Sequence, residues 1–346
     1  MAEGIKMDKT KTNENERTTP EYGDVRLSDV DKEKAYAAAS RITAEIEKVI
    51  VGKSKEVRLA VTALLSGTHV LIEDVPGVGK TTLAAALARA TGLEFRRAQF
   101  TPDVTASDIT GFNIYNRSTE RFEFTRGLFM TNVLLADEIN RAYTKTQSAL
   151  LEAMEEGRVT VDGKTYDVPE PFIVIATQNP AGFVGTYPLP EAQLDRFGIK
   201  MSLGYPTLEE EIGIVESRGG EDPISRIKPA VSAPLLIFLQ RLVSDVYIDS
   251  EVYRYIVSLV AATRTHKAVA LGASPRASIT LKRLCQAYAF MNSRDYVIPE
   301  DVYAVFGAAV AHRLTLNRDA KIRSLSCDTV TKEILHSVKI PYKGSR

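Results

Sequence analysis

The chain reads Asp74-Val75-Pro76-Gly77-Val78-Gly79-Lys80-Thr81 immediately after a short apolar run. That run, His69 to Ile72, predicts a strand, and the alanine-rich pattern from Leu83 to Ala90 predicts a helix. A strand, a glycine-bearing loop, Lys-Thr and a helix are typical of a site that cradles a nucleoside triphosphate, because glycines let backbone N–H groups converge on phosphate. Asp74 stands where the usual pattern G-x-x-x-x-G-K-[ST] has its first glycine. A short motif with one mismatch also occurs by chance, so other segments have to support it.

Two side chains of this loop have predicted roles. Lys80 is placed to neutralise the β and γ phosphates, and the Thr81 hydroxyl is placed to ligate Mg²⁺. Both roles require the backbone around them to wrap the phosphates, so we expect a contiguous set of nucleotide-binding residues. They are Pro76, Gly77, Val78, Gly79, Lys80, Thr81 and Thr82.

The composition is that of an ordinary globular protein. Of 346 residues, 44% are hydrophobic and 25% are charged, and this length suffices for two domains with separate cores. Lys+Arg and Asp+Glu both number 44, and this zero net charge argues against an electrostatic nucleic-acid binder. No apolar run approaches the roughly 20 residues needed to span a bilayer, and the N-terminus lacks the apolar centre of a secretory signal. We therefore expect a cytoplasmic chain without membrane insertion, in which Cys285 and Cys327 are reduced thiols.

The sequence divides into three regions. Residues 1–28 are polar and are expected to form a disordered tail. Residues 29–204 start with helices expected at Asp31–Ile50 and Glu56–Leu65 and then alternate apolar runs with helical patterns, which predicts an α/β domain around a parallel sheet. Residues 205–346 show helical patterns only, which predicts a small helical lid domain. The helices expected in the lid are Leu208–Ser217, Ala233–Val243, Ser250–His266, Pro275–Met291 and Pro299–Leu314.

An acidic pair follows the second predicted strand, Val133 to Ala136. Its members, Asp137 and Glu138, point to opposite sides of the strand end, so they need not share one role. Asp137 is placed to hold Mg²⁺, and Glu138 is placed to orient and deprotonate an attacking water. A solvated Asp-Glu pair is the alternative, and the phosphate loop upstream counts against it.

Three further polar residues fit the same chemistry. Asn179 follows a predicted strand at Phe172 to Ala176 and is placed to bond the γ-phosphate or the water, although Asn before Pro is also ordinary turn chemistry. Arg196 offers a cation for charge that develops in phosphoryl transfer, and an Arg–Asp pair that caps a helix is the alternative. Arg276 begins a predicted lid helix, where a cation opposes the helix dipole, so we expect an anion nearby.

These segments, in this order, resemble an AAA+ ATPase, and in finer detail the MoxR family, over residues 30 to about 340. The strings that carry the resemblance are Ile50–Gly52, Glu73–Thr81, Gln99–Asp103, Ser107–Gly111, Leu135–Ala142, Gln147–Glu156, Ala176–Pro180, Gly272–Ala277 and Arg294–Val297. Asp74 at the first glycine position is similar to the usual form of this family. One departure is Gly127-Leu128, where the family commonly has Gly-Pro ahead of the strand.

The resemblance implies an α/β AAA+ core with the parallel strand order 5-1-4-3-2 and helices on both faces, followed by a helical lid. It implies ATP and Mg²⁺ as cofactors and a homo-oligomeric ring, usually a hexamer, with ATP bound between subunits. Val51 and Gly52 would lie near adenine. Asn179 would be the sensor 1 residue, Arg196 the arginine finger and Arg276 the sensor 2 arginine.

The resemblance also assigns the two catalytic motifs. Lys80 and Thr81 would close the Walker A loop, and Asp137 and Glu138 would form the Walker B pair. Arg141 is a second candidate for the arginine that acts on the neighbouring subunit. Hydrolysis would then proceed by in-line attack of water on the γ-phosphoryl group.

The role implied by the resemblance is that of a chaperone-like remodelling or assembly factor for protein complexes or metalloenzymes. Members of the family often act with von Willebrand A domain proteins. Two insertions, one within Thr110–Phe124 and one a hairpin at Gly157–Gly163, are expected to face the ring pore or upper surface, where clients would bind. The alternatives are a nucleic-acid remodelling motor, a non-hydrolysing nucleotide-gated scaffold and the ATPase subunit of a magnesium-chelatase-like complex.

Overall fold

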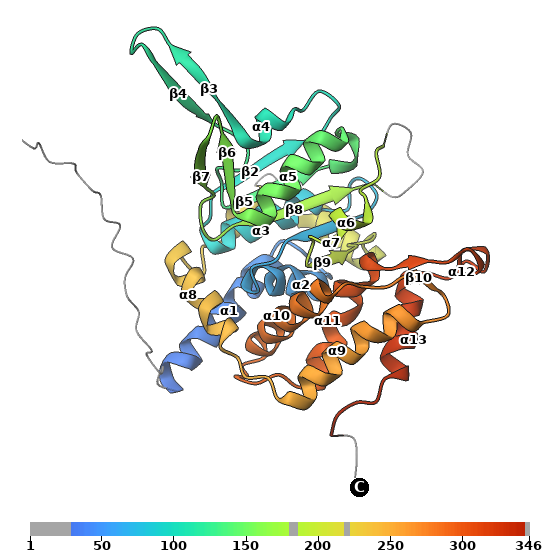
Figure 1. The fold of residues 1–346 in the computed structure, drawn as a ribbon. Coiled ribbons are helices and arrows are strands. Elements are labelled where there is room, and N and C mark those ends of the chain that lie inside the picture. The colour runs from blue at the N-terminus through green and yellow to red at the C-terminus, as the bar shows by residue number, and fades with distance from the viewer. Residues whose placement is uncertain (1–28, 180–185, 218–221, 343–346) are drawn as a thin grey trace, which may run out of the picture.

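The computed structural model describes residues 29–179, 186–217 and 222–342, and Figure 1 shows their arrangement. Five parallel strands form the central sheet in the order β2-β5-β8-β1-β9. In chain order they are β1 (Val70–Glu73), β2 (Phe95–Gln99), β5 (Val133–Asp137), β8 (Ile173–Gln178) and β9 (Ile199–Met201). When these five core strands are counted along the chain, their spatial order is 5-1-4-3-2, so the topology expected from the family resemblance is confirmed.

The three inner strands, β1, β5 and β8, are the continuous apolar runs of the sequence. All five residues of β5 are buried, as are the first five of β8. Such runs are expected where helices cover both faces of a parallel sheet. The strand predictions made from these runs are therefore confirmed. The edge strands β2 and β9 are not runs of this kind, since β2 reads Phe-Arg-Arg-Ala-Gln.

Alternate residues of β1 divide the core of the sheet into two clusters, because successive side chains point to opposite faces. Val70 and Ile72 belong to one cluster, and Leu71 belongs to the other. The first packs the sheet against α1 (Asp29–Glu47), α2 (Ser54–Leu65) and α3 (Lys80–Thr91). The second packs it against α4 (Ala106–Thr110) and α5 (Thr144–Glu156).

The chain after β9 is mostly helical. Its helices are α7 (Leu208–Ser217), α8 (Ala233–Ser244), α9 (Ser250–Thr265), α10 (Pro275–Met291), α11 (Pro299–Val310), α12 (Arg318–Ile322) and α13 (Cys327–Ser337). The expectation of helices only is wrong in one detail, because β10 (Val269–Leu271) pairs antiparallel with β11 (Thr315–Leu316). Strands this short give no alternation that a sequence pattern could reveal.

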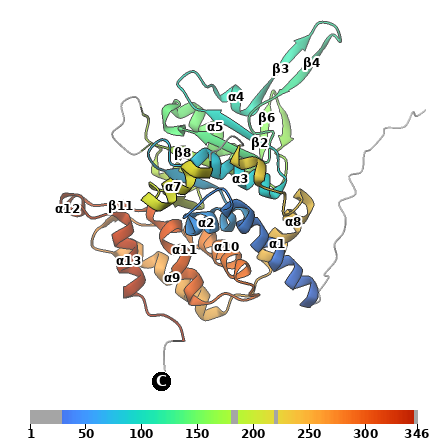
Figure 2. The ribbon, with the colours of Figure 1, turned by 180° about the vertical axis from the view of Figure 1, so that it is seen from behind.

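Helix α2 connects the sheet to the C-terminal helices. Arg58 Nη2 donates a hydrogen bond to Asn292 Oδ1 at 2.8 Å, and Gln240 Nε2 donates to Leu64 O at 2.7 Å. Figure 2 shows α2 beside α10 and α11. The two regions are thus packed together through α2, and a domain boundary at residues 204–205 stays a prediction.

Two antiparallel hairpins extend from the core. The first, β3 (Gly111–Asn116) with β4 (Arg121–Arg126), projects away from the sheet in Figure 1. The second, β6 (Arg158–Val161) with β7 (Lys164–Asp167), confirms the hairpin predicted around Gly157–Gly163. The hairpins touch each other, since the Phe124 and Tyr166 rings stack at 3.9 Å.

Three sequence predictions concern the chain as a whole. The tail predicted for residues 1–28 lies outside the described residues. Among the helices that the structure describes, none is long and apolar enough to cross a membrane. Cys285 and Cys327 are both free thiols, as predicted, and Cys285 is buried among the lid helices.

Candidate nucleotide-binding and hydrolysis site

The phosphate loop runs from the end of β1 to the first residue of α3, as the sequence predicts. Gly77 and Gly79 have φ angles of +89° and +94°, which favour glycine. A Cβ atom built on either residue would meet nothing within 4 Å. The glycines are therefore required by the backbone conformation of the loop and not by crowding. This conformation is what lets several N–H groups of one loop turn toward an anion.

Lys80 is the buried cation of the loop. Its Nζ donates a hydrogen bond to Asp74 O at 2.8 Å, so the side chain folds back along the loop that it follows. Burial lowers the pKa of Lys80, and the carboxylates of Asp137, Asp74 and Glu138 oppose this shift. The ammonium group of Lys80 thus lies in the field of the Asp137 and Glu138 carboxylates.

Asp74, the mismatch in the motif, is a structural acceptor. Its carboxylate accepts hydrogen bonds from the backbone N–H groups of Val75 (2.8 Å), Leu203 (2.7 Å) and Gly204 (2.7 Å), and from the Ser202 hydroxyl (2.9 Å). Burial raises the pKa of Asp74, but these hydrogen bonds outweigh it and the pKa is lowered. The charged side chain therefore ties the start of the phosphate loop to the chain that leaves β9.

Asp137 and its neighbours lie where β5 and β8 end side by side. The Thr177 hydroxyl donates to Asp137 Oδ1 at 2.6 Å, and Arg97 Nη2 donates to Asp137 Oδ2 at 2.7 Å. The same Thr177 oxygen accepts the backbone N–H of Glu138 at 2.9 Å. Sequence reasoning missed Thr177 and Arg97, although Thr177 lies within the Ala176–Pro180 string that carries the family resemblance.

Glu138 is held by two hydrogen bonds and one ion pair. Asn179 Nδ2 donates to its Oε1 at 3.1 Å, while Gln99 Nε2 (2.9 Å) and Arg141 Nη1 (3.0 Å) bind Oε2. The backbone of Glu138 is left-handed, with φ of 56°. A non-glycine residue in this conformation costs on the order of 1–3 kcal/mol and is typical of active sites. The structure therefore brings Glu138 and Asn179 into direct contact and adds Gln99, which sequence reasoning missed.

The structure also describes Arg141 and the segment expected near adenine, Val51 and Gly52. Arg141 pairs with Glu138 of its own chain, three residues away. Val51 is exposed, and Gly52 has a φ of +75°. A Cβ atom on Gly52 would overlap the Glu210 carboxylate of α7, so this glycine allows close approach of that helix.

Arg196 and Arg276 meet at a different place. Arg196 follows α6 (Glu191–Leu194), and its Nε donates to Glu155 Oε2 at 2.8 Å. Arg276 Nη2 lies 2.9 Å from Glu155 Oε1. Within the described chain, neither arginine forms a hydrogen bond or ion pair with the phosphate loop or with the Walker B pair. The anion expected near Arg276 is therefore Glu155.

Asp195 is the aspartate of the alternative interpretation of Arg196, in which an Arg–Asp pair caps a helix. It pairs with Arg313 at 2.6 Å and accepts a hydrogen bond from the Ser274 hydroxyl at 2.8 Å. The pair of Arg196 with an aspartate that caps a helix, which was the alternative reading, is not the arrangement found, since the partner of Arg196 is Glu155.

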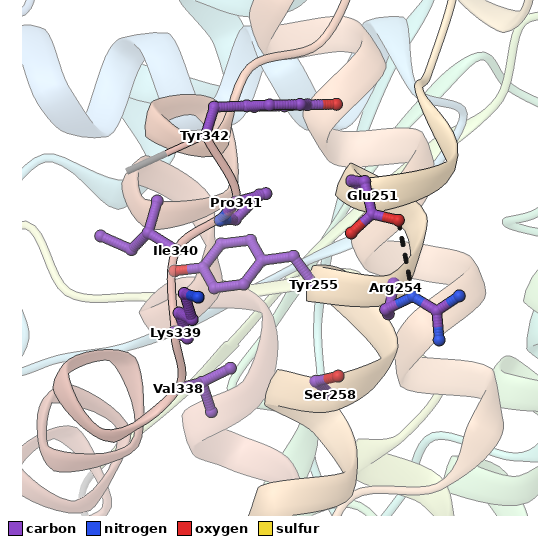
Figure 3. Close-up of a pocket in the computed structure, with 9 residues that line it drawn as sticks. All are labelled: Glu251, Arg254, Tyr255, Ser258, Val338, Lys339, Ile340, Pro341 and Tyr342. Carbon is purple, nitrogen blue, oxygen red and sulfur yellow. Dashed lines mark ion pairs between the residues drawn. The ribbon is translucent and has the colours of Figure 1, made fainter. Parts of the chain in front are cut away.

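Two surface hollows lie away from this site. One, of about 510 Å³, is lined by α9 residues and by the chain from Val338 to Tyr342 (Figure 3). The other, of about 470 Å³, shares Tyr342 with it. Neither includes a residue of the phosphate loop or the Walker B pair. The candidate site is therefore defined by the polar side chains at the ends of β5 and β8, and neither hollow forms part of it.

Comparison with known proteins places this geometry in a family. Residues 69–199 match the ATPase family associated with various cellular activities (AAA), and residues 261–334 match the AAA lid domain. The uncharacterized protein YeaC of Bacillus subtilis is 47% identical over 91% of this chain and 98% of its own length. Chaperone MoxR1 of Mycobacterium tuberculosis is 42% identical over 86% of this chain and 81% of its own length.

A solved structure agrees with these sequence matches. The crystal structure of a candidate ATPase from Cytophaga hutchinsonii superimposes with a TM-score of 0.84 at 37% identity, over 90% of this chain and 97% of that one. The phosphate loop, the Walker B pair and the sheet order agree with this fold. The chain belongs to the MoxR family of AAA+ ATPases, enzymes that bind and hydrolyse ATP.

Proposed function

We propose that this chain works as a homo-oligomeric ring, in which each subunit binds ATP and its neighbour completes the site. The observation that carries the proposal is the separation of Arg196 and Arg276 from the phosphate loop of their own chain. Both arginines are held on one carboxylate, and their side chains are partly exposed, at 28% for Arg196 and 42% for Arg276. We propose that a second subunit contacts them there. An arginine supplied by a neighbour is typically worth about 10³–10⁵ in turnover.

Within one subunit, Lys80 binds the β and γ phosphates, and the loop from Pro76 to Thr82 wraps them. The Thr81 hydroxyl and the Asp137 carboxylate are both hard oxygen donors, which fits Mg²⁺ that keeps waters and phosphate as its remaining ligands. Bound Mg²⁺ would supply charge neutralisation of the phosphates.

Glu138 is the proposed general base, and Asn179 is the group that positions it and the water. The Asn179 amide already donates to the Glu138 carboxylate, so the two side chains are within reach of one attacking water. Val51 and Gly52 are proposed to lie against adenine, beside α7. Arg196 and Arg276 are proposed to stabilise the charge that develops on the γ-phosphoryl group of the adjacent subunit.

The biological role that we propose is ATP-driven, chaperone-like remodelling or assembly of a client protein or metalloenzyme, with a von Willebrand A domain protein as partner. The name Chaperone MoxR1 of one relative supports the chaperone part of this proposal. The β3–β4 hairpin offers a surface for a client, because Phe112, Ile114, Tyr115 and Phe122 are all exposed on it, Phe122 at 72%.

The decisive test combines turnover with size. Glu138→Gln should still bind ATP but lose hydrolysis, and in ATP it should sediment as a ring. Ring size is read by analytical ultracentrifugation, and nucleotide binding by fluorescence of a labelled ATP. A protein that remains a monomer in ATP and hydrolyses it rapidly would contradict the shared site.

A further inference from the structure

Glu155 connects two cations that come from distant parts of the chain. It lies at the end of α5, Arg196 follows α6, and Arg276 is the second residue of α10. Each oxygen of the carboxylate holds one arginine, Oε2 the Nε of Arg196 at 2.8 Å and Oε1 the Nη2 of Arg276 at 2.9 Å. One side chain of the core thus fixes a core arginine and a lid arginine side by side.

The three groups are partly sheltered, and the carboxylate is charged. Their side chains are 35% (Glu155), 28% (Arg196) and 42% (Arg276) exposed. Burial raises the pKa of Glu155, but the ion pairs with Arg276 and Arg196 outweigh it, so the pKa is lowered. A carboxylate at this place also offsets the unfavourable position of Arg276 in the first turn of its helix.

The contact of Arg196 with Glu155 leaves the Nη donors of the arginine available. The contact uses Nε, and among the described residues neither Nη of Arg196 makes a hydrogen bond. Arg276 is bound through a single Nη. Because both guanidinium groups are anchored to one carboxylate, their remaining N–H groups can converge on a single further anion, and a phosphoryl group with several oxygens matches that need.

A second set of contacts, made by Asp195, connects the segment that carries Arg196 to the lid. Asp195, next to Arg196, pairs with the buried Arg313 at 2.6 Å and accepts the Ser274 hydroxyl at 2.8 Å. Ser274 directly precedes α10, the helix that carries Arg276. The segment with Arg196 and the start of α10 are therefore joined twice, through Asp195 and through Glu155. A shift of the lid would move both arginines together.

We propose that Glu155 is a positioning residue that presents Arg196 and Arg276 as one cationic unit to the nucleotide of the adjacent subunit. This inference rests on the proposed function, in which both arginines act between subunits. The opposite role is that of a latch that sequesters the arginines, and it predicts the opposite sign: removing the carboxylate would raise turnover.

The first measurement compares Glu155→Gln with Glu156→Gln. The control residue is adjacent on the same helix, is exposed and pairs only with Arg158 among the described residues. Glu155→Gln keeps the size of the side chain but loses its charge. Since small displacements of a positioning group cost up to about 100-fold in rate, we expect kcat to fall about 10- to 100-fold with KM for ATP changed less than about twofold. Glu156→Gln should hydrolyse ATP like the wild type.

The second measurement is complementation in mixed rings. Lys80→Ala is expected to lose phosphate binding, and it leaves Glu155 and both arginines unchanged. When it is mixed with Glu155→Gln, the Lys80→Ala subunits can present a well-positioned pair to the ATP of Glu155→Gln subunits. ATPase activity of the mixture should exceed the sum of the two separate proteins. A misfolded or unassembled variant cannot be rescued in this way, so rescue also shows that Glu155→Gln folds and assembles. Absence of rescue in a Glu155→Gln protein that sediments as a ring in ATP, or increased turnover in Glu155→Gln alone, would overturn the inference.

A third variant separates this inference from the function on which it rests. Arg196→Ala should be nearly inactive. If Arg196→Ala is inactive and Glu155→Gln has wild-type kcat, only the role of Glu155 is wrong. If Arg196→Ala itself hydrolyses ATP at the wild-type rate, the proposed shared site is wrong as well.

Discussion

The Asp74 carboxylate accepts a hydrogen bond from the backbone N–H of Gly204 at 2.7 Å, across 130 residues of chain. Asp74 opens the phosphate loop, and Gly204 follows the last strand of the sheet. Asp74, the mismatch in the phosphate-loop motif, thus connects the chain after the first core strand to the chain after the last one. It is satisfied by four donors and is almost fully buried.

Replacing Asp74 with asparagine should weaken this connection. The substitution keeps the shape but puts an NH₂ group where one carboxylate oxygen accepts backbone N–H groups. Because hydrogen bonds to charged groups contribute about 1.5–3 kcal/mol, we expect the free energy of unfolding to fall by about that amount. Urea denaturation measures it, with the exposed Asp103→Asn as the control. Equal stability of the two variants would show that the connection contributes little.

The lowered pKa of Asp74 also predicts how the free energy of unfolding depends on pH. The pKa of Asp74 is lower in the folded chain than in the unfolded chain, since its hydrogen bonds favour the charged form. Its contribution is therefore complete above the unfolded pKa, near about 4, and is lost as the pH falls through the folded pKa. The difference in unfolding free energy between wild type and Asp74→Asn should shrink below about pH 4. A difference that grows on acidification would contradict the assigned charge state.

How much the sequence could predict depends on what each residue contacts. The strands β1, β5 and β8 could be predicted because both of their faces are buried, which produces uninterrupted apolar runs. The edge strand β2, with two arginines among five residues, resembles a polar loop. Its position becomes visible only through its pairing with β5.

The residues of the candidate site also divide into those that the sequence could predict and those that it could not. Lys80, Asp137 and Glu138 belong to local motifs, so their place in the candidate site could be predicted from spacing. Gln99 and Glu155 could not, because their partners lie on other elements: Gln99 reaches Glu138 only since β2 lies beside β5, and Glu155 meets Arg276 only through lid packing. Such contacts depend on topology, which residue types alone do not specify.

Thr177 offers a test of how the Asp137 carboxylate, which is proposed to bind Mg²⁺, is oriented. Thr177→Val removes the hydroxyl that donates to Asp137 and accepts from the Glu138 backbone, while it keeps the shape. We expect a weaker apparent affinity for Mg²⁺ and a loss of about 1–3 kcal/mol of stability, since the Glu138 N–H is left without its acceptor. Thr177→Ser, which retains the hydroxyl, should restore both. Magnesium titration of ATPase activity measures the first effect, and an unchanged Mg²⁺ requirement in Thr177→Val would count against this orientation.

Asn179 should affect catalysis more than binding. Its Nδ2 donates to Glu138, and its Oδ1 is buried without a hydrogen bond to any described residue. Loss of one preorganised donor typically costs about 10²–10³ in rate, so Asn179→Ala should lower kcat by that factor with a small change in KM. Steady-state kinetics separates the two constants. A raised KM with unchanged kcat would instead make Asn179 a binding residue.

A second contact, between the core segment that carries Arg196 and the lid, depends on the buried Arg313. Its Nε donates to Asp195 Oδ1 at 2.6 Å, and its Nη groups donate to the carbonyl oxygens of Asp195, Phe197 and Ala309. Burial lowers the pKa of Arg313, and Asp195 opposes that shift. Arg313→Met keeps the apolar volume but leaves Asp195 without its cation, so we expect a loss of about 3 kcal/mol in unfolding free energy.

The matched control for this prediction is Arg254→Met, which removes an exposed pair with Glu251 at 3.7 Å. Exposed pairs contribute about 0–1 kcal/mol, so this variant should be nearly as stable as the wild type. Chemical denaturation of both variants gives the comparison. If Arg313→Met is no less stable than Arg254→Met, the segment that carries Arg196 does not depend on the lid for its position.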